Sequence, residues 1–436
     1  MSTTPTVPIT ELAEVNPSVD LRSISGGECA SFIPMSDVSV EGAWVNRQER
    51  RLADVRVGYT RFAEGDLLFA KITPCMEHGK GAHATGLTNG IGFGSTEFHV
   101  LRAKCRDSQR FLFHWLRAPQ TRARALAYMG GSAGQQRVSA DFFERFSIPC
   151  LPQAEHRRIA AVLDTVDEAI AKTEAVIAKL RQVRAGLLHD LLTRGLDENG
   201  ELRDPVARPE EFWDSPVGRI PRGWEVESLG ARLHKNDGWV QTGPFGTQLH
   251  AHEYADEGVP VVMPQDIADG GFSTALIARI PRGKAHELRR HQLRPGDLVF
   301  ARRGDLARCA AVTTLQTGWL CGTGCLLMRF RPRTLLSEWL SLAYRHDIGQ
   351  RQMAARAVGT TMVNLNTGLL MDLVFAFPSI GEQAKVVEAL AAIAARVNAD
   401  TEGLGKLRLL KSGLLSDLLT GRVRVPEGVG AVEVRL

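Results

Sequence analysis

The side chains best suited to binding chemistry in this 436-residue sequence are cationic, and many of them lie in one stretch. Between residues 279 and 308, nine arginines and lysines face only three acids, Glu287, Asp297 and Asp305. This density suits a polyanion such as a nucleic acid, although a solvated protein surface is the other interpretation. The net charge of +4 adds only weak support for a polyanionic partner. The nine cations are Arg279, Arg282, Lys284, Arg289, Arg290, Arg294, Arg302, Arg303 and Arg308.

Catalytic groups are absent at the spacings that catalysis needs. The chain has no Asn-Pro-Pro-Tyr or Asp-Pro-Pro-Tyr run of an adenine methyltransferase, and no phosphate-binding loop that ends in Gly-Lys-Ser or Gly-Lys-Thr. No lysine has an acid two residues before it, which excludes the acid-x-Lys pair of many metal-dependent nucleases. Cys321 and Cys325 lack the second pair of ligands that a zinc site requires. We therefore expect a non-catalytic protein that binds no metal and no cofactor of its own.

An internal duplication organises the chain. Residues 186–193 (GLLHDLLT) and 413–420 (GLLSDLLT) are identical at seven of eight positions, with an offset of 227. The same offset keeps apolar positions in step through the segment before them. Further upstream, Gly65-Asp66-Leu67 matches Gly296-Asp297-Leu298 at an offset of 231. A unit of about half the protein is far longer than a solenoid repeat, which indicates a twofold duplication.

Each half ends in a segment whose apolar residues predict a long helix. In the first half they alternate in steps of four and three, which is typical of a coiled-coil seam. A continuous helix from residue 153 to 192 would be about 60 Å long, because each residue adds ~1.5 Å. Gly403 and Gly405 favour a less regular second helix. The first seam consists of Ile159, Leu163, Val166, Ile170, Ile177, Leu180, Val183, Leu187 and Leu191.

Both seams become polar at equivalent positions, Thr173 and Asp400. If a pseudo-twofold axis relates the repeats, the helices run antiparallel and these two residues meet where the helices cross. A threonine hydroxyl can donate to a carboxylate, so we expect this pair to fix the register of the helices.

A mixed region precedes each long helix. Glycine-bounded apolar runs at 66–71 and 98–102 predict strands, and helical spacing over 110–129 predicts a helix interrupted at Pro119. We therefore predict an α/β, or α+β, region in each half. Residues 197–223 between the halves are polar and contain four prolines, which favours an extended linker.

Four stretches of the sequence resemble the specificity subunits of type I restriction-modification systems. The most specific is the helical segment 151–205, which begins LPQAEHRRIAAVLD. The others are GDLLFAKITPCMEHGK at 65–80, GPFGTQLHAHEY at 243–254, and GTTMVNLN at 359–366, whose counterpart in the first half is GSAGQQRVS at 131–139. Together they extend the resemblance over nearly the whole chain.

The resemblance implies two target-recognition domains in tandem, held apart by two long antiparallel coiled-coil helices. Each domain would read one half of a bipartite site in double-stranded DNA. The helices would dock two modification subunits, which methylate adenine with S-adenosylmethionine, and restriction subunits in the restricting complex. The implied segments are domain 1 at 1–151, the central helix at 152–196, the linker at 197–223, domain 2 at 224–377, the C-terminal helix at 378–423 and a tail at 424–436.

Under this resemblance, polar side chains on glycine-bounded loops are the candidate DNA contacts. Arg, Gln and Asn can make paired hydrogen bonds to guanine or adenine in the major groove, although ordinary turn residues are the alternative. The predicted base contacts are Gln135, Gln136 and Arg137 in the first half and Thr360, Thr361 and Asn364 in the second. The predicted phosphate contacts are Lys71, Lys80, Arg302 and Arg303, and Thr73 and Gln248 complete the predicted DNA-binding set.

Two other functions remain open from the sequence. One is a helical protein-interaction scaffold that does not read DNA sequence, which sequence-dependent binding would exclude. The other is a DNA-modifying enzyme with an unfamiliar motif, which methyl transfer by the purified chain alone would reveal. The N-terminus lacks the basic and apolar segments of a secretory signal, and no segment reaches ~18 consecutive apolar residues. We therefore expect a cytoplasmic protein with no membrane partner.

Overall fold

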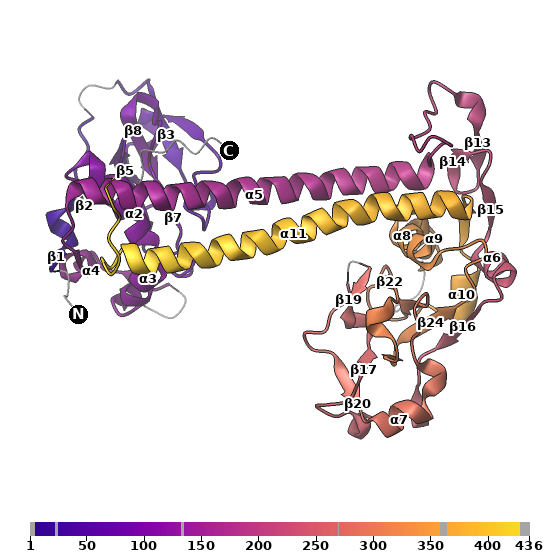
Figure 1. Ribbon diagram of the computed structural model, residues 1–436. Coiled ribbons are helices and arrows are strands. Elements are labelled where there is room, and N and C mark those ends of the chain that lie inside the picture. Colours follow the sequence, from indigo (N-terminus) through magenta and orange to yellow (C-terminus); the bar gives the residue numbers. More distant parts are fainter. Residues whose placement is uncertain (1–4, 22–24, 132–134, 269, 358–363, 428–436) are drawn as a thin grey trace. The chain divides into compact units, whose positions relative to one another are not determined.

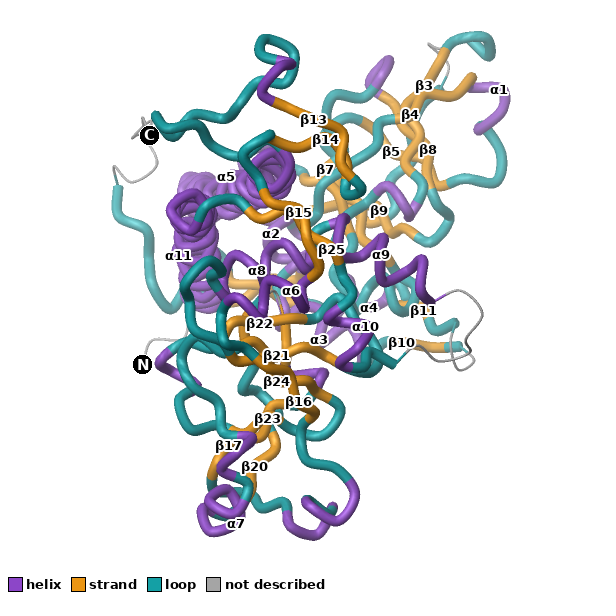
Figure 2. The backbone as a smooth tube through the Cα atoms, turned by 90° about the vertical axis from the view of Figure 1, so that its right-hand side faces the viewer, coloured by secondary structure: helices purple, strands orange, loops and turns teal. Residues whose placement is uncertain are grey.

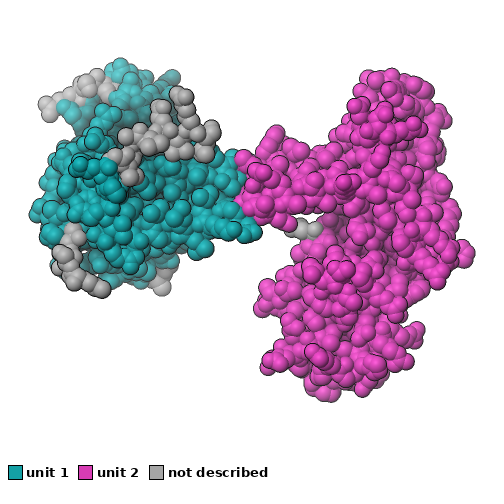
Figure 3. All heavy atoms as spheres, in the orientation of Figure 1, with its two compact units in different colours: residues 1–175, 401–436 teal, residues 176–400 magenta. Residues whose placement is uncertain are grey.

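The computed structural model describes residues 5–21, 25–131, 135–268, 270–357 and 364–427. The chain divides into two compact units (Figure 3). Unit 1 comprises residues 1–175 and 401–436, and unit 2 comprises residues 176–400. The division falls inside both long helices, so each unit contains one mixed region and a part of each helix.

Unit 1 is built on a four-stranded antiparallel sheet with the strand order β2-β9-β6-β7, whose outer strands β2 and β7 are labelled in Figure 1. A second sheet, β4-β3-β8-β5, contains the parallel pair β3–β8. Helix α2 packs on the first sheet, and its aromatic residues belong to the main core of the unit. The elements are β1 (Thr6–Pro8), β2 (Ala13–Val15), β3 (Cys29–Ile33), β4 (Gln48–Arg51), α1 (Leu52–Val55), β5 (Thr60–Ala63), β6 (Leu67–Ala70), β7 (Gly81–His83), β8 (Ile91–Gly94), β9 (Phe98–Ala103), α2 (Gln109–Arg117), α3 (Pro119–Leu126), β10 (Met129–Gly130), β11 (Arg137–Val138), α4 (Asp141–Arg145) and β12 (Ser147–Pro149).

Unit 2 repeats this topology. Its main sheet has the order β16-β24-β21-β22, again antiparallel, and helix α8 packs on β22 (Figure 2). The sheet β20-β17-β23 contains the parallel pair β17–β23, as the β3–β8 pair does in unit 1. The elements are β13 (Phe212–Ser215), β14 (Gly218–Pro221), β15 (Glu225–Ser228), α6 (Leu229–Lys235), β16 (Trp239–Thr242), β17 (Val259–Val262), β18 (Ile267–Ala268), β19 (Gly271–Phe272), β20 (Ala278–Ile280), α7 (Arg282–Glu287), β21 (Leu298–Ala301), β22 (Cys309–Ala311), β23 (Leu320–Cys321), β24 (Cys325–Arg329), α8 (Ser337–Arg345), α9 (Asp347–Ala357), α10 (Thr367–Met371) and β25 (Val374–Phe377).

The shared strand order confirms the internal duplication, and β6, β9 and the break between α2 and α3 confirm the predicted strands and interrupted helix. The repeated Gly-Asp-Leu sequence has a structural cause. Each aspartate is buried at the start of a strand and accepts two hydrogen bonds of 2.7–2.8 Å from an arginine, Asp66 from Arg102 and Asp297 from Arg329. The same ion pair therefore anchors the central strands of both main sheets.

The long helices are α5 (Gln153–Thr193) and α11 (Ile380–Leu418), and their segments run antiparallel within each unit. In unit 1, Glu155 near the start of α5 pairs with Arg424, just beyond the end of α11. In unit 2, Glu382 near the start of α11 pairs with Arg203, beyond the end of α5, at 2.7 Å. Within the described ranges, no helix combines the length and hydrophobicity needed to cross a membrane.

Helix α11 continues through Gly403 and Gly405, so the expected irregularity of the second helix is wrong. The cost of each glycine, about 1 kcal/mol relative to alanine, is offset locally because Leu404 is buried. Lys406 also pairs with Glu402 one turn away, at 2.7 Å.

Burial along the helices is uneven. Ile159 and Leu163 of α5 are fully buried in the core of unit 1, together with Leu415 and Leu418 of α11. Toward the middle of α5, Val183 of the predicted seam retains 44% exposure. Further apolar side chains on these helices are exposed, namely Val176, Leu409 and Leu410.

The segment predicted as an extended linker contains a β-hairpin at β13–β14, so that prediction is wrong for residues 212–221. Ile220 and Trp224 form a small buried cluster with Ala376. Pro221 ends its strand, a position at which proline is tolerated. The prolines and acids favoured a linker in the prediction, although the segment also contains enough apolar side chains to form a hairpin.

Candidate nucleic-acid interface

In unit 1, backbone hydrogen bonds bring four predicted DNA-binding residues together at one end of the main sheet. Lys71 follows β6, and its carbonyl accepts from Val138 N at 2.9 Å. Thr73 N donates to Gln136 O at 3.0 Å, which brings Gln136 and Arg137 alongside the segment after β6. We use the name loop frame for this arrangement, in which the backbone just after a central strand hydrogen-bonds to a later segment of the chain, here residues 136–138. The frame brings Lys71, Thr73, Gln136 and Arg137 together.

The guanidinium of Arg137 is hydrogen-bonded to Glu97, which was not among the DNA-binding residues predicted from the sequence. Nε and Nη2 of Arg137 each donate to the Glu97 carboxylate at 2.9 Å, and Nη1 donates to Gln135 O at 3.2 Å. The hydrogen bond from Arg137 lowers the pKa of Glu97, so this carboxylate is ionised at neutral pH. The guanidinium is thereby oriented, and Gln135 and Arg137 are both exposed to solvent.

His99 is hydrogen-bonded to the same loop frame. This buried histidine has a pKa lowered by burial, so it is neutral, and Nε2 lies 2.8 Å from Val138 O as a donor. Asn16 Nδ2 lies 3.2 Å from His99 Nδ1 and donates to it. Asn16, His99 and Lys71 line a cavity of about 540 Å³. The only sequence signal for Glu97 and His99 is their alternating spacing at the start of a predicted strand.

Unit 2 contains the same loop frame with different side chains. Arg302 follows β21, its N–H donates to Gly324 O at 2.8 Å, and its carbonyl accepts from Leu365 N at 3.0 Å. The corresponding bonds in unit 1 join Lys71 to Glu97 O and to Val138 N. The offset of 227 makes Gly324 the equivalent of Glu97 and Asn364 the equivalent of Arg137. Asn364 is exposed, whereas Thr360 and Thr361 lie outside the described residues.

The loop that carries Gln248 lies beside this second frame. Thr323 Oγ1 donates to Pro244 O at 2.8 Å, which ties the loop to the segment that ends at Gly324. A Cβ at Gly243 would lie 1.9 Å from Gly322 O, so only glycine permits this close approach. Gln248 is exposed at the tip of the loop.

The other predicted phosphate contacts have varied surroundings. Lys80 is half-buried, and its ammonium donates to Met35 O at 3.1 Å. The Nε of Arg302 is buried without a hydrogen-bond partner among the described residues. Arg303 is exposed and lines a cavity of about 370 Å³ with Asp305 and Arg308.

The basic stretch 279–308 does not form one surface. Some of its cations are paired within the protein, for example Lys284 with Glu253 at 2.8 Å. Others surround a cavity of about 790 Å³ with Trp239, which begins β16, and Arg329, which ends β24. Because β16 and β24 are antiparallel neighbours, this cavity lies toward the end of the sheet opposite the loop frame. The cations of the stretch that line it are Arg289, Arg290 and Arg294.

The predicted register residues each have a partner within their own helix. The Thr173 hydroxyl donates to Ala169 O at 2.7 Å, and Asp400 accepts from Arg396 Nε at 3.0 Å. Thr173 belongs to unit 1 and Asp400 to unit 2, and their meeting stays a prediction.

Comparisons with known proteins agree on one family. Residues 55–182 match the model of the type I restriction modification DNA specificity domain. The specificity subunits of the Escherichia coli type I restriction enzymes EcoEI and EcoAI are 30% identical over 213 residues and 40% identical over 211 residues. Each match covers 48% of this chain and 36% of the relative, so the chain spans about a third of the length of these curated relatives.

Two solved structures share the fold over nearly the whole chain. One is described as "Structural basis underlying complex assembly and conformational transition of the type I R-M system", with a TM-score of 0.56 and 20% identity over 97% of this chain and 100% of that one. The other is the type I restriction-modification system S subunit from M. genitalium, with a TM-score of 0.55 and 15% identity over 95% of this chain and 96% of that one.

Proposed function

We propose that this chain belongs to the family of type I restriction-modification specificity subunits, recognises double-stranded DNA and reads half of a bipartite site with each unit. The observation that carries the proposal is the repeated loop frame. The same backbone atoms join Lys71 to Val138 in unit 1 and Arg302 to Leu365 in unit 2. The side chains that each frame presents differ, so the two half-sites differ in sequence.

We assign base reading to the exposed polar side chains on the frames. Arg137 suits guanine, because a guanidinium oriented by a carboxylate keeps N–H groups for O6 and N7. Gln135 and Gln136 in unit 1, and Asn364 in unit 2, suit adenine. Thr360 and Thr361 belong to the same proposed set. Phosphate contacts position the protein without reading the sequence. We assign them to Lys71, Lys80, Arg302 and Arg303. Thr73 and Gln248 are proposed as further polar contacts to DNA.

The long helices supply the proposed docking surface for other subunits. Val176, Val183, Leu409 and Leu410 leave apolar area exposed on α5 and α11, and such area is suited to packing against partner helices. We assign this surface to two modification subunits, which bind S-adenosylmethionine and methylate adenine, and to restriction subunits where the complex includes them. This chain then recognises the site and performs no chemistry.

The helix pair also sets the distance between the half-sites in this proposal. A polar contact between Thr173 and Asp400 would fix the register of α5 against α11. Replacing Asp400 with Leu should leave the protein folded but let the helices slide. Methylation should then tolerate altered spacing between half-sites before recognition of either half-site weakens.

Mapping methylated adenines in host DNA, with and without this gene, tests the function directly. We expect one bipartite motif to lose methylation when the gene is deleted and to regain it on complementation. In parallel, gel shifts should show specific binding when the chain is assembled with modification subunits. Equal binding of all sequences by that assembly would favour a protein-interaction scaffold instead.

A further inference from the structure

The internal duplication reveals a difference in charge between the two ends of the helix pair. In unit 1, two cations of α11 are neutralised by acids of α5. Arg408 Nη2 lies 2.7 Å from Glu174 Oε1, and Lys411 Nζ lies 2.5 Å from Asp167 Oδ1. Both salt bridges lie within unit 1.

The equivalent cations are present in unit 2, but neither Asp167 nor Glu174 has an acidic equivalent, because Ala394 and Thr401 occupy those positions. The offset of 227 places Arg184 at the position of Lys411 and Arg181 at that of Arg408. The Nε of Arg184 is buried and has no hydrogen-bond partner among the described residues. Neither arginine forms an ion pair with any acid in the part of unit 2 that the structure describes.

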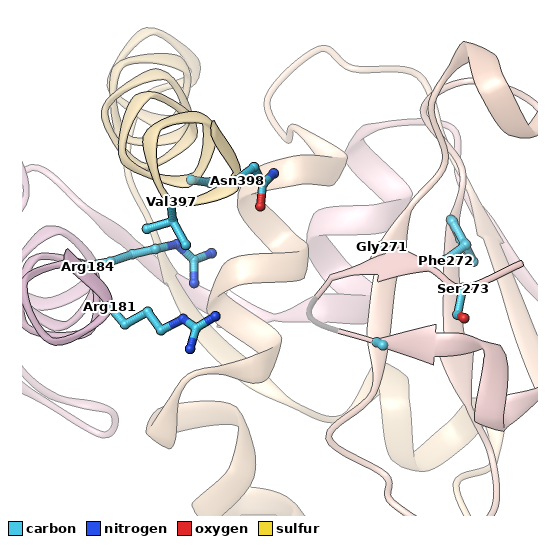
Figure 4. Close-up of a pocket in the computed structure, with 9 residues that line it drawn as sticks. Arg181, Arg184, Gly271, Phe272, Ser273, Val397 and Asn398 are labelled. Carbon is cyan, nitrogen blue, oxygen red and sulfur yellow. The ribbon is translucent and has the colours of Figure 1, made fainter. Parts of the chain in front are cut away.

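These two arginines line a cavity of about 580 Å³ that lies entirely within unit 2. Figure 4 shows both guanidinium groups extending from α5 into it, with Asn398 of α11 above them and Ser273 across from them. The cavity wall opposite the helices is formed by the β18–β19 hairpin and Ser273. Asp269 lies outside the described residues. The described lining thus offers two guanidinium groups, a carboxamide and a hydroxyl as donors.

We propose that this cavity binds a phosphate group. The guanidinium groups of Arg181 and Arg184 line this cavity, and no ion pair with a described acid neutralises them, so they favour an anion there. Guanidinium groups bind phosphate through paired, charge-assisted hydrogen bonds, and a second arginine one helical turn away adds a further pair of donors. The phosphate is either a phosphodiester of bound DNA or part of a small free compound. The site is separate from the loop frames, so it goes beyond the proposed base reading.

The unit 1 arrangement supplies the sharpest test. Ala394→Asp restores the carboxylate that unit 1 carries, so it should pair with Arg184 and close the site without removing either cation. Binding of sodium pyrophosphate to the full chain, measured by calorimetry at low salt, should weaken at least about tenfold in this variant and in Arg181→Gln/Arg184→Gln. Arg408→Gln is the matched control, because it removes the equivalent but paired cation, and it should bind as the wild type does. Thermal melting shows whether each variant is folded.

A duplex without a recognition site separates the two sources of phosphate. If DNA supplies the phosphate, pyrophosphate should compete with this duplex and Ala394→Asp should weaken its binding. If a free compound supplies it, duplex binding should be unchanged while pyrophosphate binding is lost. The proposal is overturned if wild-type protein binds neither probe through these arginines, or if Arg408→Gln and Arg181→Gln/Arg184→Gln lose pyrophosphate binding equally.

Discussion

Replacing Arg137 with alanine is the clearest test of the proposed base reading, because the structure shows how many N–H groups of this side chain are not engaged within the protein. An arginine carries five N–H donors. Three are engaged within the protein, two by the Glu97 carboxylate and one by the carbonyl of Gln135. Two N–H groups remain, which is the number that a guanine accepts through O6 and N7.

The size of the effect follows from those two bonds. A bidentate pair of this kind discriminates against the wrong base by roughly tenfold to a hundredfold. Arg137→Ala should remove that preference at one base pair of the unit 1 half-site and leave the other positions unchanged. Glu97→Gln keeps the shape of the partner but removes its charge. Its effect should therefore be smaller and fall on the same base pair.

The assay is competitive binding by the assembly with modification subunits, using duplexes that differ at one position of the half-site. Lys71→Ala is the control from the same frame, because a phosphate contact carries no sequence information. That variant should weaken all duplexes alike and reduce the steepness of the salt dependence. The reasoning is refuted if Arg137→Ala also weakens every duplex to the same degree, because its side chain would then contact only the DNA backbone.

Three further outcomes are expected. The purified chain alone should neither methylate nor cleave DNA and should bind it without sequence preference; tight, specific binding at physiological salt would contradict this. Asp66→Ala should destabilise unit 1 by about 3 kcal/mol, because it leaves Arg102 without its buried partner, and hydrogen exchange should show the loss there but not in unit 2. Burial lowers the pKa of His156 to about 4, so its contribution to stability is present above pH 6.5 and is lost as the pH falls toward 4. His156→Gln, which introduces the residue of the equivalent position Gln383, should make acid melting of unit 1 less steep.

Local patterns in the sequence predicted much of the architecture. The step pattern of apolar residues predicted α5 and α11, and the repeated Gly-Asp-Leu marked the start of the central strand in both sheets. Pro119 marked the break between α2 and α3. These features depend on residues close in sequence, so a single chain reveals them.

The partners within the candidate site could not be predicted in the same way. Arg137 and Glu97 are 40 residues apart, and they meet only because the backbone of Lys71 hydrogen-bonds to both Glu97 and Val138. The positions of the cations in the basic stretch 279–308 could not be predicted for the same reason. Composition showed its charge, but the fold pairs Lys284 with Glu253 and turns Arg290 toward a cavity at the other end of the sheet.

The loop frame is joined by main-chain atoms, Lys71 O to Val138 N and Arg302 O to Leu365 N. A mutation that exchanges an exposed side chain on the frame therefore leaves those bonds intact and costs the fold little. If the proposed base reading is correct, the preferred bases can therefore change without a compensating substitution elsewhere in the chain. In the same proposal, the two copies could diverge in base preference after the duplication while the backbone bonds of the frames were kept, and Asn364 occupies the position equivalent to Arg137.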